Sequence, residues 1–250
     1  MISIKNAEQL QRMRVAGRIT GEALLVAEEA VRPGISTKAL EEVIRHHIEK
    51  RGARPTFLGY GGFPGAACIS VNDEVIHGIP SENRILQEGD IVKVDVGATI
   101  NGYTGDAART FPVGQITAEA AALIDATRES FFRAVQAAIS GNRIGDIGNA
   151  VESYVRPLGY TVVRKYVGHG VGAELHEDPN VPNYGTPGHG PRLFPGMTIA
   201  IEPMVNAGGA DVRVLENHWT VVTSDGSLSA HYENTVAIGE NGPELLTYIR

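Results

Sequence analysis

The sequence predicts an α+β fold in which two related halves pack around β-strands. Helix-like and strand-like patterns follow in the order helix, helix, strands, and this order occurs twice in the 250 residues. A single shift of 107 residues aligns the helical pattern of residues 34–52 with that of 141–159 without a gap, and it places Asp95 on Glu202. We therefore expect one domain over residues 1–250, with halves of about 6–113 and 117–239 that are related by a pseudo-two-fold axis.

The helices are predicted from apolar residues that recur every three or four positions. The first pattern begins after Asn6, a typical N-cap residue, with Gln9 at the third helical position, and it stops at Pro33 and Gly34. The other predicted helices cover residues 36–51, 117–140 and 144–158.

The strands are predicted where β-branched and other apolar residues run together between turn residues. They cover residues 66–71, 90–98, 104–113, 160–167, 197–206, 212–223 and 230–238. Asp95 and Asp106 lie on two strands joined by a turn. A turn centred on residues 100–101 places these aspartates directly opposite each other, whereas one centred on Asn101-Gly102 makes them diagonal neighbours. Either register leaves both on one face of the hairpin.

The composition excludes several classes of protein. Lys plus Arg is 22 and Asp plus Glu is 29, a net charge of −7, so DNA is not an expected partner. The lone cysteine, Cys68, rules out an internal disulfide and suits the reducing cytoplasm. Residues 1–14 lack the apolar core of a signal peptide, and no apolar run approaches the ~18 residues of a membrane span. We expect a cytoplasmic protein that does not bind membranes.

The carboxylates indicate metal chemistry. Asp95 and Asp106 repel each other unless a proton or a cation lies between them, although one of them could simply cap the turn. The second half adds Glu202 and Glu233 in apolar strands, and His169 among glycines. Carboxylates with imidazole suit divalent metals, and four carboxylates balance two such ions. This composition is typical of a two-metal hydrolase with a bridging water.

Other catalytic chemistries do not fit the spacing. His176-Glu177 begins like the zinc protease motif, but the second histidine is absent and Pro179 breaks the required helix. Neither a G-x-S-x-G elbow nor a Walker A sequence occurs. The glycines around His169 do not open a helix, so a dinucleotide loop is not expected. Cys68 lies in an apolar segment and is expected to be a buried or pocket-wall residue.

The order and setting of these residues resemble the type I methionine aminopeptidases. The resemblance covers residues 4–247 and includes the segments Ser70–Pro80, Ile201–Gly208 and Asp225–Ala230. It implies the pita-bread fold, in which two αβ halves surround a central curved antiparallel sheet and the helices lie on its outer face. It also implies an enzyme that removes the initiator methionine from new proteins whose second residue is small.

The resemblance assigns a role to each matching residue. Asp106 and Glu233 would bridge two metal ions, Asp95 would hold one, and His169 with Glu202 would complete the other. The metals would convert a bridging water into a hydroxide-like nucleophile that attacks the scissile carbonyl, and Glu202 would receive its proton. The remaining matching residues are His176, which would stabilise the oxyanion, and His77, which would contact the substrate amide. Both histidines could instead be hydrogen-bonding loop residues.

The methionine pocket implied by the resemblance is apolar. It consists of Tyr60, Phe63, Cys68, Leu175 and Trp219, although Trp219 could equally be a core residue. Three positions depart from many relatives. Leu175 replaces an aromatic residue or methionine, Phe63 replaces a frequent tyrosine, and Asn234 replaces a common histidine beside Glu233.

The subtype and partners follow from the same resemblance. The interval from Glu202 to Glu233 has no room for the helical insertion of type II enzymes, and the chain starts close to its first helix. We expect a bacterial-type monomer without an N-terminal extension, which acts on nascent polypeptide N-termini with Co, Mn, Fe, Ni or Zn. Ten Lys/Arg against seven Asp/Glu in residues 1–56 are compatible with transient ribosome contact, or with an ordinary solvated helix face. An Xaa-Pro peptidase and a non-catalytic binding protein of the same fold remain alternatives.

Overall fold

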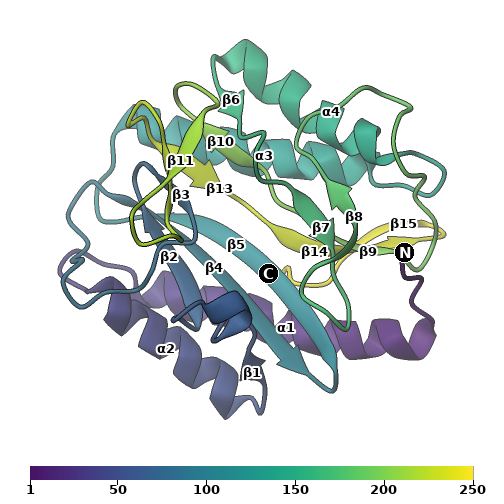
Figure 1. Cartoon of the computed structure of the whole chain (residues 1–250), viewed down its shortest axis with the longest axis horizontal. Coiled ribbons are helices and arrows are strands. Elements are labelled where there is room, and N and C mark those ends of the chain that lie inside the picture. Colours follow the sequence, from purple (N-terminus) through teal and green to yellow (C-terminus); the bar gives the residue numbers. More distant parts are fainter. Residues whose placement is uncertain (250) are drawn as a thin grey trace.

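The computed structural model describes residues 1–249 and shows two pairs of helices on either side of a layer of antiparallel strands (Figure 1). Helices α1 (Ala7–Ala30) and α2 (Thr37–Lys50) lie along one side, and α3 (Ala118–Ala137) and α4 (Ile144–Val155) lie along the other. The predicted α+β class, with its helices outside a central layer of strands, is confirmed.

The helix ends follow the capping residues in the sequence. Asn6 Oδ1 accepts a hydrogen bond from Gln9 N and Gln9 Oε1 accepts one from Asn6 N, both at 2.9 Å, so the predicted N-terminus of α1 is confirmed. Two predicted helices were too long. Helix α3 ends at Ala137, and α4 gives way at Arg156 to a 3₁₀ turn that Gly159 ends in a left-handed conformation.

Four of the five strands of the first half pair around the hairpin that carries the two aspartates, whereas β3 (Glu74–Ile76) pairs with a strand of the second half. The other four are β1 (Arg54–Pro55), β2 (Ala67–Val71), β4 (Ile91–Ile100) and β5 (Tyr103–Pro112). Strand β4 lies between β5 on one side and β1 and β2 on the other. Asp95 pairs with Ala108, and Asp106 pairs with Gly97. The register centred on Asn101-Gly102 is therefore correct, and the two aspartates are diagonal neighbours.

In the second half the predicted strands are shorter than expected, and three strands were not predicted. The strands of this half are β6 (Thr161–Val162), β7 (Gly168–Gly170), β8 (Glu177–Val181), β9 (Thr198–Ile201), β10 (Met204–Asn206), β11 (Val212–Val214), β12 (Val221–Thr223), β13 (Ser229–His231), β14 (Asn234–Gly239) and β15 (Gly242–Leu245). Strands β7, β8 and β15 are those that were not predicted. The predicted strands 197–206, 212–223 and 230–238 are each interrupted, and 160–167 is reduced to two residues. Pro203 explains the first break, because it has no N–H to donate to a ladder.

In the second half, two of the strand breaks lie at the glutamates of the site, Glu202 and Glu233. Strands β15, β14, β9, β7 and β8 form one sheet, β13, β10 and β6 form another, and β11, β12 and β3 form a third. Ile201 pairs with Asn234 before the break, and Met204 pairs with His231 after it. The register on both sides therefore places Glu202 opposite Glu233.

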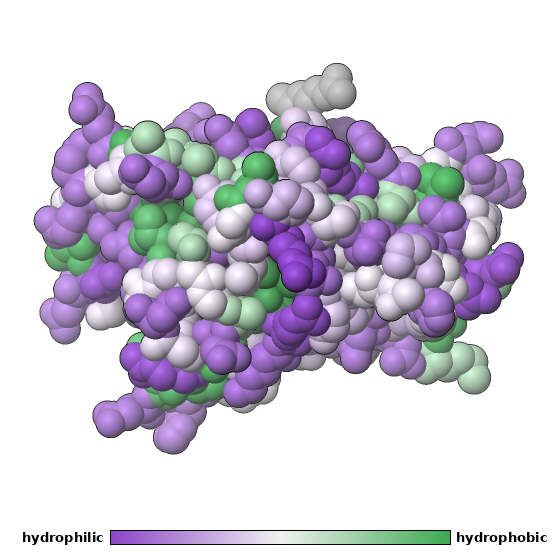
Figure 2. Space-filling view, turned by 90° about the horizontal axis from the view of Figure 1, so that it is seen from above, coloured by the Kyte–Doolittle hydropathy of each residue, from purple (hydrophilic) through white to green (hydrophobic). Residues whose placement is uncertain are grey.

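Two apolar cores hold the strands in place from outside. One packs α1 and α2 against β2, β4 and β5, with Leu40, Ile44 and Val94 fully buried. The other packs α3 and α4 against the second half, with Phe131 and Ile147 buried. Seen from above in Figure 2, the surface is largely hydrophilic and its apolar groups are small and separate. Within residues 1–249, no helix combines the length and the apolar content that a membrane crossing requires.

Candidate metal centre

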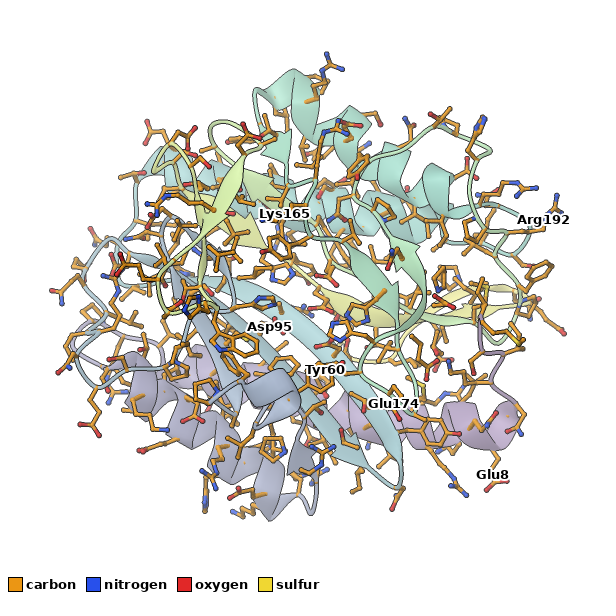
Figure 3. The ribbon with its side chains drawn as sticks, in the orientation of Figure 1. Glu8, Tyr60, Asp95, Lys165, Glu174 and Arg192 are labelled. Atoms are coloured by element: carbon orange, nitrogen blue, oxygen red, sulfur yellow. The ribbon has the colours of Figure 1, made fainter. Side chains whose placement is uncertain are left out.

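A cavity of about 150 Å³ lies where the two halves meet. Every site residue that the sequence indicated lines it: Tyr60, Phe63, Cys68, His77, Asp95, Asp106, His169, Leu175, His176, Glu202, Trp219 and Glu233. Sequence reasoning missed four further lining residues, namely Phe57, Ile76, Tyr166 and Val167. Tyr166 and Val167 precede the glycines around His169, and this proximity was the available signal. In Figure 3, Asp95 and Tyr60 lie near the middle of the molecule, whereas Glu8 and Arg192 lie at its periphery.

The carboxylates of the site are buried without the partners that a buried charge needs. Asp106 is 4% exposed and Glu233 is 2% exposed. Among residues 1–249, Asp95 Oδ1, Asp106 Oδ1 and Glu233 Oε1 have no hydrogen-bond partner. Burial raises the pKa of Asp95 to about 7, and burial with the neighbouring carboxylates raises the pKa values of Asp106, Glu202 and Glu233 well above their usual range. Buried carboxylates with oxygens that lack partners favour the binding of a cation.

His169 is oriented as a metal ligand. Its Nδ1 lies 2.8 Å from the carbonyl oxygen of Gly170, which can only accept, so the proton is on Nδ1 and the lone pair is on Nε2. That Nε2 lies 3.6 Å from Asp106 Oδ2 and 3.5 Å from Glu202 Oε1. Burial lowers the pKa of His169 to about 4, so the imidazole is neutral at pH 7. A neutral imidazole whose second nitrogen donates to a carbonyl is the usual form of a metal-bound histidine.

These donors fit a divalent cation. Ligand atoms of Asp106, His169 and Glu233 all lie within 4.8 Å of one another. Asp95 and Glu202 line the same cavity and bring further carboxylate oxygens. Oxygen donors without partners, together with one neutral nitrogen, are the set that borderline divalent metals prefer.

Backbone contacts between the halves position the two central carboxylates. Thr235 Oγ1 accepts a hydrogen bond from Asp106 N at 3.0 Å and donates one to Asp106 O at 2.9 Å. Glu233 N donates to Ala108 O at 2.9 Å. Strand β5 of the first half therefore runs directly against the Glu233 segment of the second.

Arg109 also holds the Glu233 segment in position. Sequence reasoning missed this residue. Its guanidinium donates to the carbonyl oxygens of Ala108 and Glu233 and to Asn234 Oδ1, and it stacks on the ring of Tyr232 at 4.0 Å. Asn234 Oδ1 also accepts from Thr247 Oγ1 at 3.0 Å. Asn234, which departs from many relatives, thus serves as an acceptor that joins the metal-site strand to the C-terminal segment. An arginine three residues after Asp106 in the same predicted strand was the available signal.

The two predicted loop histidines flank the cavity. His77 has a left-handed backbone with φ 59°, and burial, with a smaller effect of His176, lowers its pKa to about 4. The ring of His176 packs against that of His169, with 4.2 Å between their centroids, and its Nδ1 lies 2.8 Å from the Tyr60 hydroxyl. Burial lowers the pKa of His176 as well.

An apolar wall closes the other side of the cavity. Phe63 and Trp219 meet edge to face, with 5.2 Å between their centroids. Cys68 and Leu175 are buried in the same cluster, together with Phe57. Burial raises the pKa of the Cys68 thiol well above its usual value, so the thiol is neutral and suits a pocket wall.

His231 is a polar group at the site that sequence reasoning did not assign. It is 1% exposed, and its Nε2 lies 3.9 Å from Glu202 Oε2 and 3.9 Å from Glu233 Oε2. Neither ring nitrogen has a hydrogen-bond partner in the part of the chain described. Burial lowers its pKa to about 3, so it is neutral beside the carboxylates. Its position two residues before Glu233, on the same face of an extended chain, was the available signal.

Comparison with known proteins gives consistent matches. The sequence matches the model of metallopeptidase family M24 over residues 11–240. It is 58% identical over 247 residues to a methionine aminopeptidase of Clostridium acetobutylicum, covering 99% of each chain. The crystal structure of methionine aminopeptidase from Thermotoga maritima is similar with a TM-score of 0.98 and 45% identity over 100% of both chains. A prolidase from Pyrococcus furiosus is similar with a TM-score of 0.79 and 25% identity, over 99% of this chain and 66% of the prolidase.

Proposed function

The chain belongs to metallopeptidase family M24 and, within it, to the type I methionine aminopeptidases, and from this membership we propose that it removes the initiator methionine from nascent proteins whose second residue is small. The observation that carries the proposal is one cavity that combines Asp95, Asp106, His169, Glu202 and Glu233 with an apolar wall. The wall offers a site for a methionine side chain, and the ligand set offers a site for the reacting peptide bond.

We propose that two divalent ions occupy the carboxylate cluster. Asp106 and Glu233 would be shared, Asp95 would hold one ion, and His169 with Glu202 would hold the other. The four carboxylates support this number, because their full charge balances two dications, and their partnerless oxygens support it further. When bound, such ions lower the pKa of a coordinated water and polarise the scissile carbonyl. The donor set accepts Co, Mn, Fe, Ni or Zn.

The residues of the chain supply proton transfer and orientation. Glu202 accepts the proton of the attacking water, because its carboxylate lines the same cavity as the other proposed ligands. His176 donates a hydrogen bond to the carbonyl oxygen as negative charge develops on it. His77 contacts the substrate amide from the opposite loop. Phe63, Trp219 and their neighbours exclude water around the methionine side chain.

The substrate class is tested by release of the first residue from short peptides. We expect rapid release from Met-Ala-Ser and negligible cleavage of Gly-Pro. Similarity to a prolidase makes the Xaa-Pro peptidases the natural competitor, so Met-Pro is included in the panel. Preference for a Pro bond that follows a residue other than methionine would reject the proposed specificity.

The metal role is tested by Asp106→Ala. Removing a central carboxylate should abolish turnover and metal loading, while the fold stays largely intact because the side chain contributes charge repulsion rather than packing. Metal content is measured by elemental analysis, turnover with Met-Ala-Ser and fold by circular dichroism. In parallel, chelation should remove activity from the wild type, and re-addition of a divalent metal should restore it. Unchanged activity in the variant, or full activity after chelation, would falsify the metal-site model.

A further inference from the structure

We propose that the Tyr60 hydroxyl is a positioning group for His176, because it donates a hydrogen bond to Nδ1 and so keeps the single proton of the neutral imidazole on Nε2. The inference rests on the proposed function in one respect, namely that the Nε2–H of His176 is the donor to the carbonyl oxygen. Tyr60 then acts on the reaction through His176, in addition to lining the cavity.

The contact itself is short and specific. The Tyr60 hydroxyl oxygen lies 2.8 Å from His176 Nδ1, and the two ring centroids are 5.4 Å apart. Among residues 1–249, the phenol has no second hydrogen-bond partner. A phenol is a stronger donor than acceptor, and the unprotonated nitrogen of an imidazole is a good acceptor. The bond is therefore satisfied best when Tyr60 donates and His176 carries its proton on Nε2.

Because His176 lies beside the metal centre, its tautomer decides whether Nε2 can donate a hydrogen bond to the reacting carbonyl oxygen. Its ring packs against the ring of His169, so it lies directly beside the metal centre. The two nitrogens of an imidazole point in widely different directions, so an Nδ1 engaged by Tyr60 leaves Nε2 pointing away from the Tyr60 loop. With the proton on Nε2, that nitrogen can donate to a developing oxyanion. With the proton on Nδ1, it would present a lone pair to negative charge instead.

The loop that carries Tyr60 is held in a defined backbone conformation. Gly59, Gly61 and Gly62 have φ values of 80°, 56° and 92°, a left-handed run that residues with a side chain rarely adopt. Within the loop, Tyr60 N donates to Phe57 O and Phe63 N donates to Tyr60 O, both at 2.9 Å. Phe63 in turn packs on Trp219. The backbone at Tyr60 is therefore set by a turn packed on the apolar wall, while Tyr60 itself is 43% exposed and its hydroxyl contacts His176.

The environment of Tyr60 keeps its hydroxyl protonated, as a hydrogen-bond donor to His176 must be. Tyr60 lies near the middle of the view in Figure 3. Partial burial, and after it the charges of Glu174 and Asp106, raise the pKa of Tyr60, so the phenol retains the proton that it donates.

The test is Tyr60→Phe in the metal-loaded full chain, which removes the hydroxyl and keeps the ring. Nitrogen-15 NMR of the His176 side chain reports the tautomer directly. We expect Nε2 to carry the proton in the wild type, and both nitrogens to share it in the variant. We also expect kcat for Met-Ala-Ser to fall about 10-fold, the order seen when a supporting hydrogen bond to a site residue is lost, with KM changed less than about twofold.

Two further measurements separate positioning from a general structural effect. In a His176→Ala background, Tyr60→Phe should lower kcat no further, because its partner is gone. Tyr160→Phe, on a half-buried tyrosine packed against the second core, is the matched control and should change neither tautomer nor kcat.

Each result decides the proposal. An unchanged tautomer in Tyr60→Phe would overturn it, as would an unchanged kcat or an equal loss of kcat in the His176→Ala background. A protein that showed the tautomer shift but released no methionine would retain the Tyr60–His176 interaction and refute the proposed function instead.

Discussion

Burying the charged carboxylates of the metal centre costs electrostatic free energy, and a bound cation would offset this cost. Asp106 and Glu233 are buried in the same cavity as Asp95 and Glu202, and burial together with the charges of neighbouring carboxylates raises the pKa of both. A carboxylate that is transferred from water to such a site without a partner favours its protonated form. The metal-free protein must therefore either keep protons on these groups or lose stability.

The cost of burying the Glu233 charge should appear when the stability of the Glu233→Gln variant is compared with that of the wild type at several pH values. Burial, followed by the charges of Asp106, Glu202 and Asp95, raises the folded-state pKa of Glu233 above its unfolded value. For such a carboxyl the folded state binds more protons, so stability is lost as pH rises from about 4 towards the folded pKa. Glutamine mimics the protonated form at every pH. The metal-free variant should match the wild type near pH 4 and exceed it increasingly up to pH 8.

The measurement is the thermal unfolding midpoint of chelator-treated protein at several pH values, taken as a difference between the two chains. Titrating groups outside the carboxylate cluster are present in both proteins and cancel in that difference. Glu216→Gln, at an exposed position, provides the control and should give a flat difference. A wild type that stayed as stable as the variant at pH 8 would contradict the charge assignment.

The gathering of the candidate ligands in one cavity was predictable because a lone charge in an apolar strand is conspicuous in the sequence. His231 and Arg109 were harder to assign, because their roles depend on which strand faces them. His231 approaches Glu202 only through the register of β10 and β13. Arg109 reaches Glu233 and Asn234 across the boundary between the two halves. Contacts of this kind between distant segments are not encoded in local spacing.

At the level of elements, helix α1 supports the strand that carries Asp106. Gly17 faces the backbone of β5 and of the C-terminal segment, and a Cβ on it would lie 2.3 Å from Leu246 O. Thr20, one turn later, donates to Gly105 O at 3.1 Å. The helix can approach this closely because Gly17 has no side chain. This direct contact between α1 and β5 supports the strand that carries Asp106.

Gly17→Ala should destabilise the protein even though alanine is the better helix former. The gain in helix propensity is about 1 kcal/mol, whereas overpacking against a backbone carbonyl costs about 2 kcal/mol. We expect a net loss of about 1 kcal/mol in the free energy of unfolding, measured with urea on metal-free protein. Displacing the Leu246 segment, which hydrogen-bonds Thr235 beside Asp106, should also weaken metal binding. Arg18→Ala, on the exposed face of the same helix, should stay within about 0.5 kcal/mol of the wild type. Equal effects of the two substitutions would exclude the close contact.

The helices and the first hairpin were predictable to within a few residues because capping and periodicity are local signals. The Asn6 cap and the Asn101-Gly102 turn are examples. The breaks at Glu202 and Glu233 were not predicted, because an apolar run shows no sign of where pairing changes from one sheet to another. Strand β8 was not predicted because it contains Pro179, and proline usually interrupts a strand. Proline is tolerated here because β8 lies at the edge of its sheet.

For the whole molecule, the metal centre lies on the boundary between the two halves. Asp95 and Asp106 come from the first half, and His169, Glu202 and Glu233 come from the second. The two apolar cores lie outside this boundary, one on each side. Hydrogen bonds of β5 with Glu233 and Thr235 join the halves at the carboxylates themselves. A bound cation should therefore act as a link between halves as well as a reactant.

Metal binding should consequently protect the boundary more than the outer helices in hydrogen exchange. A ligand that binds only the closed form suppresses opening by up to about 100-fold at 100 times its Kd. We expect amides of residues 106–108 and 233–235 to exchange much faster after chelation, because the repelling carboxylates lie directly beside them. Amides of α2 and α4 pack on their own cores and should change little. Exchange measured by mass spectrometry with and without added Mn²⁺ tests this. A uniform change across all segments would show instead that the metal stabilises the fold as one unit, without a preferential effect at the boundary.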